Sequence, residues 1–305
     1  MAGEHRLALL PLLVALLCSS VPSFAQGPFV NFEAKQTRSI QLSPDQTRLF
    51  VVNTPDARLS VFDVIDPSRP VLVAEIPVGI GPVSVNARTD DEVWVVNEVS
   101  DSVSVVSVSG GIVTDTLYVQ DEPADVVFAN GRAFVSATRR NEVAVFDINT
   151  HVQLAAIPLL GESPRALALS EDGSKLYAAF ALSGNRTTLV PFEDAPAQPD
   201  PVNPLLPDPP QVGLIVDAAD PTWAPAVIGF SMPDNDVVEI DTDTVAVTRY
   251  FPRVGTVNLA LAVSPVSGDI HVANTDARNL VRFEPELRGH FVTNRISVIS
   301  EADGA

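Results

Sequence analysis

Cysteine is nearly absent from the sequence: the 305 residues contain one, Cys18, close to the N-terminus. An apolar stretch at residues 7–17 follows an arginine and precedes the small-x-small sequence SFA at 23–25, which is the pattern of a secretory signal peptide. We expect cleavage after Ala25. Because that cleavage removes Cys18, residues 26–305 would hold no disulfide, no thiolate metal site and no covalently attached haem. Acylation of Cys18 in a lipid anchor is the alternative, although Leu17 stands where such sites usually have a small residue.

Long hydrophobic runs and positive charge are also scarce. Beyond the N-terminal stretch, no segment approaches the roughly 18–20 apolar residues that a membrane-spanning helix needs. The 19 Lys and Arg residues stand against 38 Asp and Glu residues, so the formal net charge is −19. This charge repels phosphate backbones and argues against a nucleic-acid partner. We therefore expect an exported protein, periplasmic or extracellular, with no transmembrane segment.

Histidines are too few and too scattered to indicate a metal site. His5 leaves with the signal peptide, and His151, His271 and His290 show no ligand-like spacing. Neither a Gly-x-Ser-x-Gly elbow, a Gly-rich phosphate loop nor a His-Glu-x-x-His pattern is found. We expect no metal or other cofactor within this chain, and the balance of the sequence is against an enzyme.

What the sequence does have is repetition. An apolar strand, a polar tip and an alternating strand read LFVVNTPDARLSVFDV at 49–64 and recur as IHVANTDARNLVRFEP at 270–285. Further copies begin at residues 93, 133, 176 and 226. Short alternating runs precede and follow the copies, which gives four short strands in about forty residues. Such a repeat is typical of propeller blades, each of which buries its faces against its neighbours.

The repeat resembles that of the YVTN-type β-propeller family, bacterial secreted or periplasmic propellers of a lactonase-like superfamily. The likeness rests on VVN at 51–53 and 95–97, VFD at 61–63 and 145–147, IPVG at 76–79, and prolines opening the innermost strands at Pro82, Pro123 and Pro164. It covers roughly 36–300 and implies an all-β fold, a β-propeller of four-stranded antiparallel blades with six units visible. Related rings commonly close with seven blades. Either six blades close here, fastened by residues 29–33, or a seven-bladed ring is incomplete and the chain is a fragment.

The repeat is interrupted by residues from about 192 to 225, which hold nine prolines. Because proline cannot donate a ladder hydrogen bond, we expect a surface excursion between the fourth and fifth units. The predicted organisation is a signal peptide at 1–25 and one propeller domain at 26–305 that carries this insert.

In such blades the tips between the second and third strands share one face with the connections into the next blade. We call this surface the connection face; its tips lie near residues 53–58, 97–101 and 138–141, and its connections near 79–82, 121–123 and 162–164. Arginines are scarce in this acidic chain, yet several lie at or beside this face. We predict them as donors to an anionic ligand: Arg58, Arg139, Arg140, Arg165, Arg186 and Arg278.

The sequence therefore predicts an exported, non-catalytic propeller that binds a protein partner or a small anionic ligand at the connection face. The resemblance implies an alternative, because lactonase-type hydrolases work at the channel mouth with His, Arg and acidic residues. None of His151, His271 and His290 falls on a predicted tip of that face. A structural cell-surface protein is a third interpretation. Longer proteins with similar propellers continue into cytochrome domains, so the front part of a larger redox protein is a further alternative.

Overall fold

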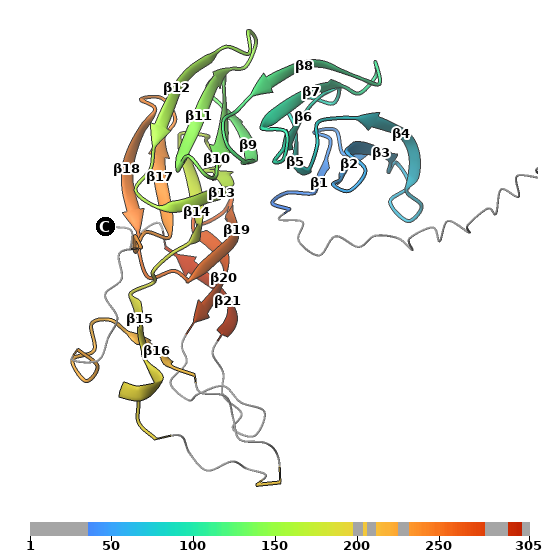
Figure 1. Ribbon diagram of the computed structural model, residues 1–305. Helices are drawn as coiled ribbons and strands as arrows, with labels where there is room; N and C mark the ends of the chain where they lie inside the picture. Colours follow the sequence, from blue (N-terminus) through green and yellow to red (C-terminus); the bar gives the residue numbers. More distant parts are fainter. Residues whose placement is uncertain (1–35, 198–203, 206–211, 225–231, 278–291, 301–305) are drawn as a thin grey trace, which may run out of the picture. The chain divides into compact units, whose positions relative to one another are not determined.

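The computed structural model describes residues 36–197, 204–205, 212–224, 232–277 and 292–300. All of them belong to one compact unit that spans residues 34–305. They fold into antiparallel sheets, and the one helix among them is a short 3₁₀ turn at Phe192–Asp194 (Figure 1). The expected signal peptide at 1–25 lies outside the described residues, as do His290 and Arg278.

The first three sheets have four strands each, in chain order, because each strand is joined to the next by a short connection. Blade 1 consists of β1 (Ile40–Leu42), β2 (Arg48–Asn53), β3 (Arg58–Asp63) and β4 (Val71–Pro77). Blade 2 consists of β5 (Pro82–Ala87), β6 (Glu92–Asn97), β7 (Ser102–Ser107) and β8 (Ile112–Tyr118). Blade 3 consists of β9 (Pro123–Ala129), β10 (Arg132–Ala137), β11 (Glu142–Asp147) and β12 (Gln153–Pro158).

The fourth sheet is interrupted. Blade 4 consists of β13 (Glu162–Leu169), β14 (Lys175–Leu182), β17 (Val237–Asp241) and β18 (Ala246–Phe251). Between its second and third strands the chain forms a separate two-stranded sheet of β15 (Thr187–Val190) and β16 (Leu214–Asp217). Blade 5 has three strands: β19 (Val257–Val263), β20 (Ile270–Ala277) and β21 (Val292–Ile299).

The repeat copies that begin at 176 and 226 therefore belong to one blade, and the described residues form five blades rather than six units. β14 of the first copy pairs with β17 of the second, with Leu176 opposite Ile240. The insert lies within this blade instead of between two units. The prediction of two separate units was wrong because β15 has the apolar character of a third strand. It pairs instead with β16, where Thr187 lies opposite Asp217.

The final strand also differs from expectation. From the sequence alone, the run at 291–299 is predicted to be the fourth strand of its unit. Instead β21 pairs directly with β20, with Ile299 opposite Ile270, and so takes the third position in blade 5. The sequence pattern indicates a strand but not the strand with which it pairs.

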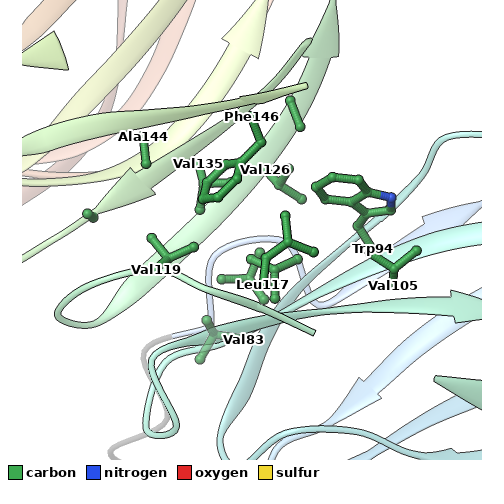
Figure 2. Close-up of a cluster of buried hydrophobic side chains, with 13 residues drawn as sticks. Val83, Trp94, Val105, Leu117, Val119, Val126, Val135, Ala144 and Phe146 are labelled. Carbon is green, nitrogen blue, oxygen red and sulfur yellow. The ribbon is translucent and has the colours of Figure 1, made fainter. Parts of the chain in front are cut away.

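The core lies between blades. β6 is buried at five consecutive positions, 93–97, because both faces of an inner strand are covered by neighbouring sheets. In Figure 2, Trp94, Val105 and Leu117 of blade 2 lie against Val126, Val135 and Phe146 of blade 3. Alternating valines supply one apolar face to each neighbour, which is why the sequence repeats them. Each blade is stabilised mainly by the next one.

The turns between the first and second strands of blades 1 and 4 are stabilised by Ser and Asp side chains. Ser43 Oγ donates to Asp45 Oδ1 at 2.6 Å, and Ser170 Oγ donates to Asp172 Oδ1 at the same distance. These hydroxyl hydrogen bonds, with backbone N–H donors two residues on, lower the pKa of Asp45 and of Asp172 to about 2. The two turns therefore have the same hydrogen-bonded structure.

Candidate functional site

The connection face is arranged as the repeat predicts. In blade 2 the Glu98 N–H donates to the Gly81 carbonyl at 2.9 Å, so the tip lies beside the preceding connection. In blade 3 the Thr138 N–H donates to the Glu122 carbonyl at 3.1 Å in the same way. Side chains from tips and connections therefore meet on one surface, and its arginines decide where an anion could bind.

The Arg165 guanidinium is already bound by other residues of the protein. This nearly buried side chain begins in blade 4, and its Nη1 donates to Glu98 Oε1 of blade 2 at 2.7 Å. Its Nη2 lies 3.4 Å from Thr37 Oγ1, just before blade 1. A guanidinium held in this way joins the inner ends of three blades. We interpret its role as structural.

A second polar link joins the first strands of the blades. Asp125 is fully buried in blade 3, and its Oδ1 accepts from Ser84 Oγ at 2.6 Å. Its Oδ2 accepts from the Leu167 N–H at 3.0 Å and lies 3.4 Å from Arg38 Nη2. The Val126 N–H donates to Oδ1 as well, at 3.0 Å, so this buried carboxylate has four donors and is satisfied. It contributes to registration of the blades rather than to ligand binding.

Three further predicted arginines are not gathered into one site. Arg58 Nε pairs with Asp56 at 2.9 Å, and Arg139 Nε pairs with Glu122 at 3.3 Å, both at exposed positions where ion pairs contribute little. Arg140 is exposed beside Arg139. The prediction for Arg278 lies outside the described residues.

Arg186 does line a cavity, of about 360 Å³, at the base of the insert. We call it the arginine pocket; its lining residues are Asn185, Arg186, Asp217, Ala219, Arg253, Asp276 and Arg295. Three guanidinium groups against two carboxylates leave one net positive charge. In a chain whose formal net charge is −19, such a pocket is electrostatically exceptional. It lies on the connection face, because Arg253 is in a blade-to-blade connection and Asp276 lies at the end of a second strand.

One side of the arginine pocket is a fixed wall. Arg295 on β21 donates from Nε to Asn274 Oδ1 at 3.0 Å, from Nη1 to Asp276 Oδ2 at 3.0 Å, and from Nη2 to the Val254 carbonyl at 2.7 Å. Asn185 Nδ2 donates to the other oxygen, Asp276 Oδ1, at 2.8 Å. A carboxylate held at both oxygens by neutral and cationic donors is already neutralised. This wall shapes the pocket but does not repel an anion strongly.

The wall depends on a glycine. A Cβ atom at Gly255 would lie 2.7 Å from Asn274 Cβ and 2.8 Å from Asn274 Oδ1, closer than such atoms approach. Any side chain at this position would displace Asn274 and with it the seat of the Arg295 guanidinium. Gly255 therefore belongs to the geometry of the pocket.

The opposite side of the arginine pocket holds the two guanidinium groups that are available to a ligand. Among the residues that the structure describes, neither the Arg186 nor the Arg253 guanidinium has an ion-pair or hydrogen-bond partner. The Arg186 backbone is nevertheless anchored, because its N–H donates to Asp234 Oδ1 at 2.8 Å. Two unpaired guanidinium groups facing one cavity can chelate a small anion through their paired N–H donors.

Sequence reasoning missed two of the three arginines. Arg253 had a usable signal, since it precedes Gly255 in a connection of the same kind as residues 79–82. Arg295 had none, because the sequence pattern does not show which strand residues 292–299 pair with. Its place beside Asn274 follows from the pairing of β21 with β20.

The described histidines lie away from the connection face. His151 Nδ1 is 2.6 Å from Asp115 Oδ2, and its ring packs edge-on against Trp94 at 5.4 Å. That hydrogen bond holds the pKa of Asp115 below its usual value. His271 is exposed on β20. The described residues contain no group of three or more His, Cys, Asp or Glu side chains placed to hold a metal ion.

Within the same described ranges, no helix is long and apolar enough to cross a membrane.

Comparisons with known proteins agree with this architecture. The family model described as lactonase, 7-bladed beta-propeller matches residues 33–194, more than half of the chain. No curated protein matches. Among solved structures, Kuenenia stuttgartiensis hydrazine synthase is similar with a TM-score of 0.64 and 19% identity, over 90% of this chain and 66% of that chain. A functionally unknown protein from Desulfotomaculum acetoxidans DSM 771 gives a TM-score of 0.51 and 13% identity, over 84% and 69%.

At these identities the structural likenesses show the fold alone. The chain spans slightly less than two thirds of the hydrazine synthase chain that it resembles. The all-β expectation is confirmed, with antiparallel blades of which four are four-stranded.

Proposed function

The chain belongs to the lactonase family of seven-bladed β-propellers, and we propose that it is a non-catalytic binding propeller that takes a small anionic ligand in the arginine pocket. This proposal changes the predicted set of ligand-binding arginines. Of the six predicted arginines, it keeps Arg186, and it adds Arg253 and Arg295. The finer assignment to YVTN-type repeats stays a prediction.

The observation that carries the proposal is the pair of guanidinium groups of Arg186 and Arg253, which face one cavity and have no partner among the described residues. Each presents a planar fork of N–H donors that matches the two oxygens of a carboxylate. The net charge of the pocket is one positive unit, which suits a monoanion better than a polyphosphate. A monocarboxylate is therefore the ligand class with the best match in charge and geometry.

The test uses acetate as the probe and isothermal titration calorimetry on the purified protein at constant ionic strength. We expect saturable binding that weakens at least tenfold in an Arg186→Gln/Arg253→Gln variant. The matched control, Arg139→Gln/Arg140→Gln, removes the same charge from the same face outside the pocket. It should bind acetate as the wild type does. Absence of saturable binding, or an equal loss in both variants, contradicts the proposal.

A lactonase-type hydrolase is the second candidate, favoured by family membership. Opening of a lactone by water yields a hydroxy-carboxylate, so a pocket for monocarboxylates would also suit the product. Against catalysis stands the lack of a histidine among the described residues of the connection face. Proton release from a δ-lactone, followed in a pH-stat, decides between them: turnover above buffer that is lost in Arg186→Gln/Arg253→Gln establishes the hydrolase.

Export is part of the proposal and rests on the pattern of residues 1–25. A mature N-terminus at Gln26, found by terminal sequencing of protein from the native host, would support it. A protein partner, a structural surface role and a place in a larger redox protein remain alternative proposals without a specific observation in their favour.

A further inference from the structure

A second cavity, of about 300 Å³, lies beside the arginine pocket. We call it the apolar pocket, because most of its lining is aliphatic: Leu182, Leu189, Ile215, Met232, Val257 and Ala277 contribute side chains, with threonine hydroxyls between them. Single exposed leucines are ordinary on a protein surface, whereas here several aliphatic groups converge on one hollow. Such a surface gains free energy when an apolar group covers it.

The two pockets share a wall. Asn185 Nδ2 donates to Asp276 Oδ1, which lines the arginine pocket, and lies 3.2 Å from Thr256 Oγ1, which lines the apolar pocket. The Ala277 N–H donates to the same Thr256 Oγ1 at 3.0 Å. Chain neighbours therefore line opposite sides: Asp276 faces one cavity and Ala277 the other. Arg186, whose guanidinium has no partner in the part of the chain that the structure describes, is next in sequence to Thr187 at the rim of the apolar pocket.

We infer that the ligand is a monocarboxylate with a hydrocarbon tail, whose carboxylate binds Arg186 and Arg253 while its tail crosses the shared wall into the apolar pocket. This inference rests on the proposed function and specifies its ligand. A neutral hydrocarbon would leave both guanidinium groups unused. A hydrophilic polyanion would leave the apolar pocket open. Its negative charge would also exceed the single net positive charge of the arginine pocket.

The size of the tail follows from the cavity volume. The apolar pocket, at about 300 Å³, is twice as large as a cavity of about 150 Å³ that binds benzene. A chain of about six to eight carbons therefore fits. Each methylene buried strengthens binding about fourfold, so burial of three of the six extra methylenes of octanoate would give about a sixtyfold gain over acetate.

The experiment compares octanoate, acetate and 1-octanol by calorimetry on the purified protein. We expect octanoate to bind at least thirtyfold more tightly than acetate, and 1-octanol, which lacks the charge, to bind more weakly than octanoate. Leu189→Gln should reduce octanoate affinity at least fivefold and leave acetate affinity unchanged. Leu160→Gln, an exposed leucine on the same face outside the pocket, is the matched control and should change neither.

The outcomes separate the two proposals. If acetate binds through Arg186 and Arg253 but octanoate binds no more tightly, the tail inference is overturned and the proposed function stands. If octanoate binds equally well to the wild type and to Leu189→Gln, the tail lies elsewhere and the inference is again overturned. If neither carboxylate binds, the proposed function fails and the inference fails with it.

Discussion

Asp236 shows how a single buried carboxyl group ties the insert to the blades. It is fully buried immediately before β17, where its Oδ2 accepts from the backbone N–H groups of Val254 and Gly255. Its Oδ1 has no hydrogen-bond partner among the described residues. Burial raises the pKa of Asp236, and the Ser183 hydroxyl and the two amide donors oppose this shift only partly. The connection that carries Arg253 is therefore held by a carboxyl group whose pKa is raised by burial.

This shift predicts a pH dependence of stability. Because the pKa is higher in the folded than in the unfolded chain, the folded state binds more protons between the two values, and the free energy of unfolding falls as pH rises through that window. Asp236→Asn keeps an acceptor for both amides and cannot ionise. We expect the stability of the variant relative to wild type to increase from pH 4 to pH 7, measured by chemical denaturation. A constant difference would show that Asp236 is ionised throughout.

At the scale of the element, packing between blades should dominate stability. Phe146 and Phe62 occupy equivalent places in the two VFD segments, in β11 and β3. Phe146 is packed between blades 2 and 3, whereas Phe62 is only half-buried on the outer face of blade 1. The same residue in the same local structure thus meets two different environments.

We expect Phe146→Ala to lower the free energy of unfolding by about 3–5 kcal/mol, as for other fully buried phenylalanines. Phe62→Ala should cost about 1–2 kcal/mol, because much of its ring already contacts water. Urea denaturation of the two variants measures both values, and Phe62→Ala serves as the matched control. Equal losses would mean that the first blade is covered as completely as the third.

Elements were predicted from the sequence more reliably than their partners. The strands that contain residues 49–53, 93–97 and 133–137 follow directly from their alternating apolar residues, and so do the tips on the connection face. The assignment of β15 failed because residues 187–190 satisfy the same pattern while pairing with β16. Local pattern fixes a strand, whereas its neighbour depends on closure of loops that the pattern does not report. Arg295 was missed for the same reason, and Arg165 was misjudged because a charge at a predicted mouth can be neutralised by a distant Glu98.

At the scale of the whole molecule, the outer face of blade 5 carries apolar residues that resemble an interblade contact. Ile296 and Val298 on β21 occupy the positions that Val103 and Val105 hold on β7. The two valines are 0% and 2% exposed, while Ile296 and Val298 are 70% and 56% exposed. The described residues supply five blades, and the family name specifies seven. This face therefore has the character of a surface that packs against a further sheet.

We expect the 305-residue polypeptide, prepared on its own, to self-associate through this face at micromolar concentrations. An Ile296→Lys/Val298→Lys variant should be monomeric in sedimentation velocity, since two charges would oppose burial of the face. Val266→Lys, at an exposed turn between β19 and β20, is the control and should leave association unchanged. A monomeric wild type would contradict the prediction.

The interrupted fourth blade also has a kinetic consequence. Partners in adjacent strands of blade 3, such as Ala133 and Phe146, are 13 residues apart, whereas Leu176 and Ile240 in blade 4 are 64 apart. Closing the longer loop costs about 1.4 kcal/mol more in chain entropy. Formation of the β14–β17 pair should therefore come late in folding. The arginine pocket lies at the base of that loop, so a bound carboxylate would stabilise a part of the propeller that forms late in folding.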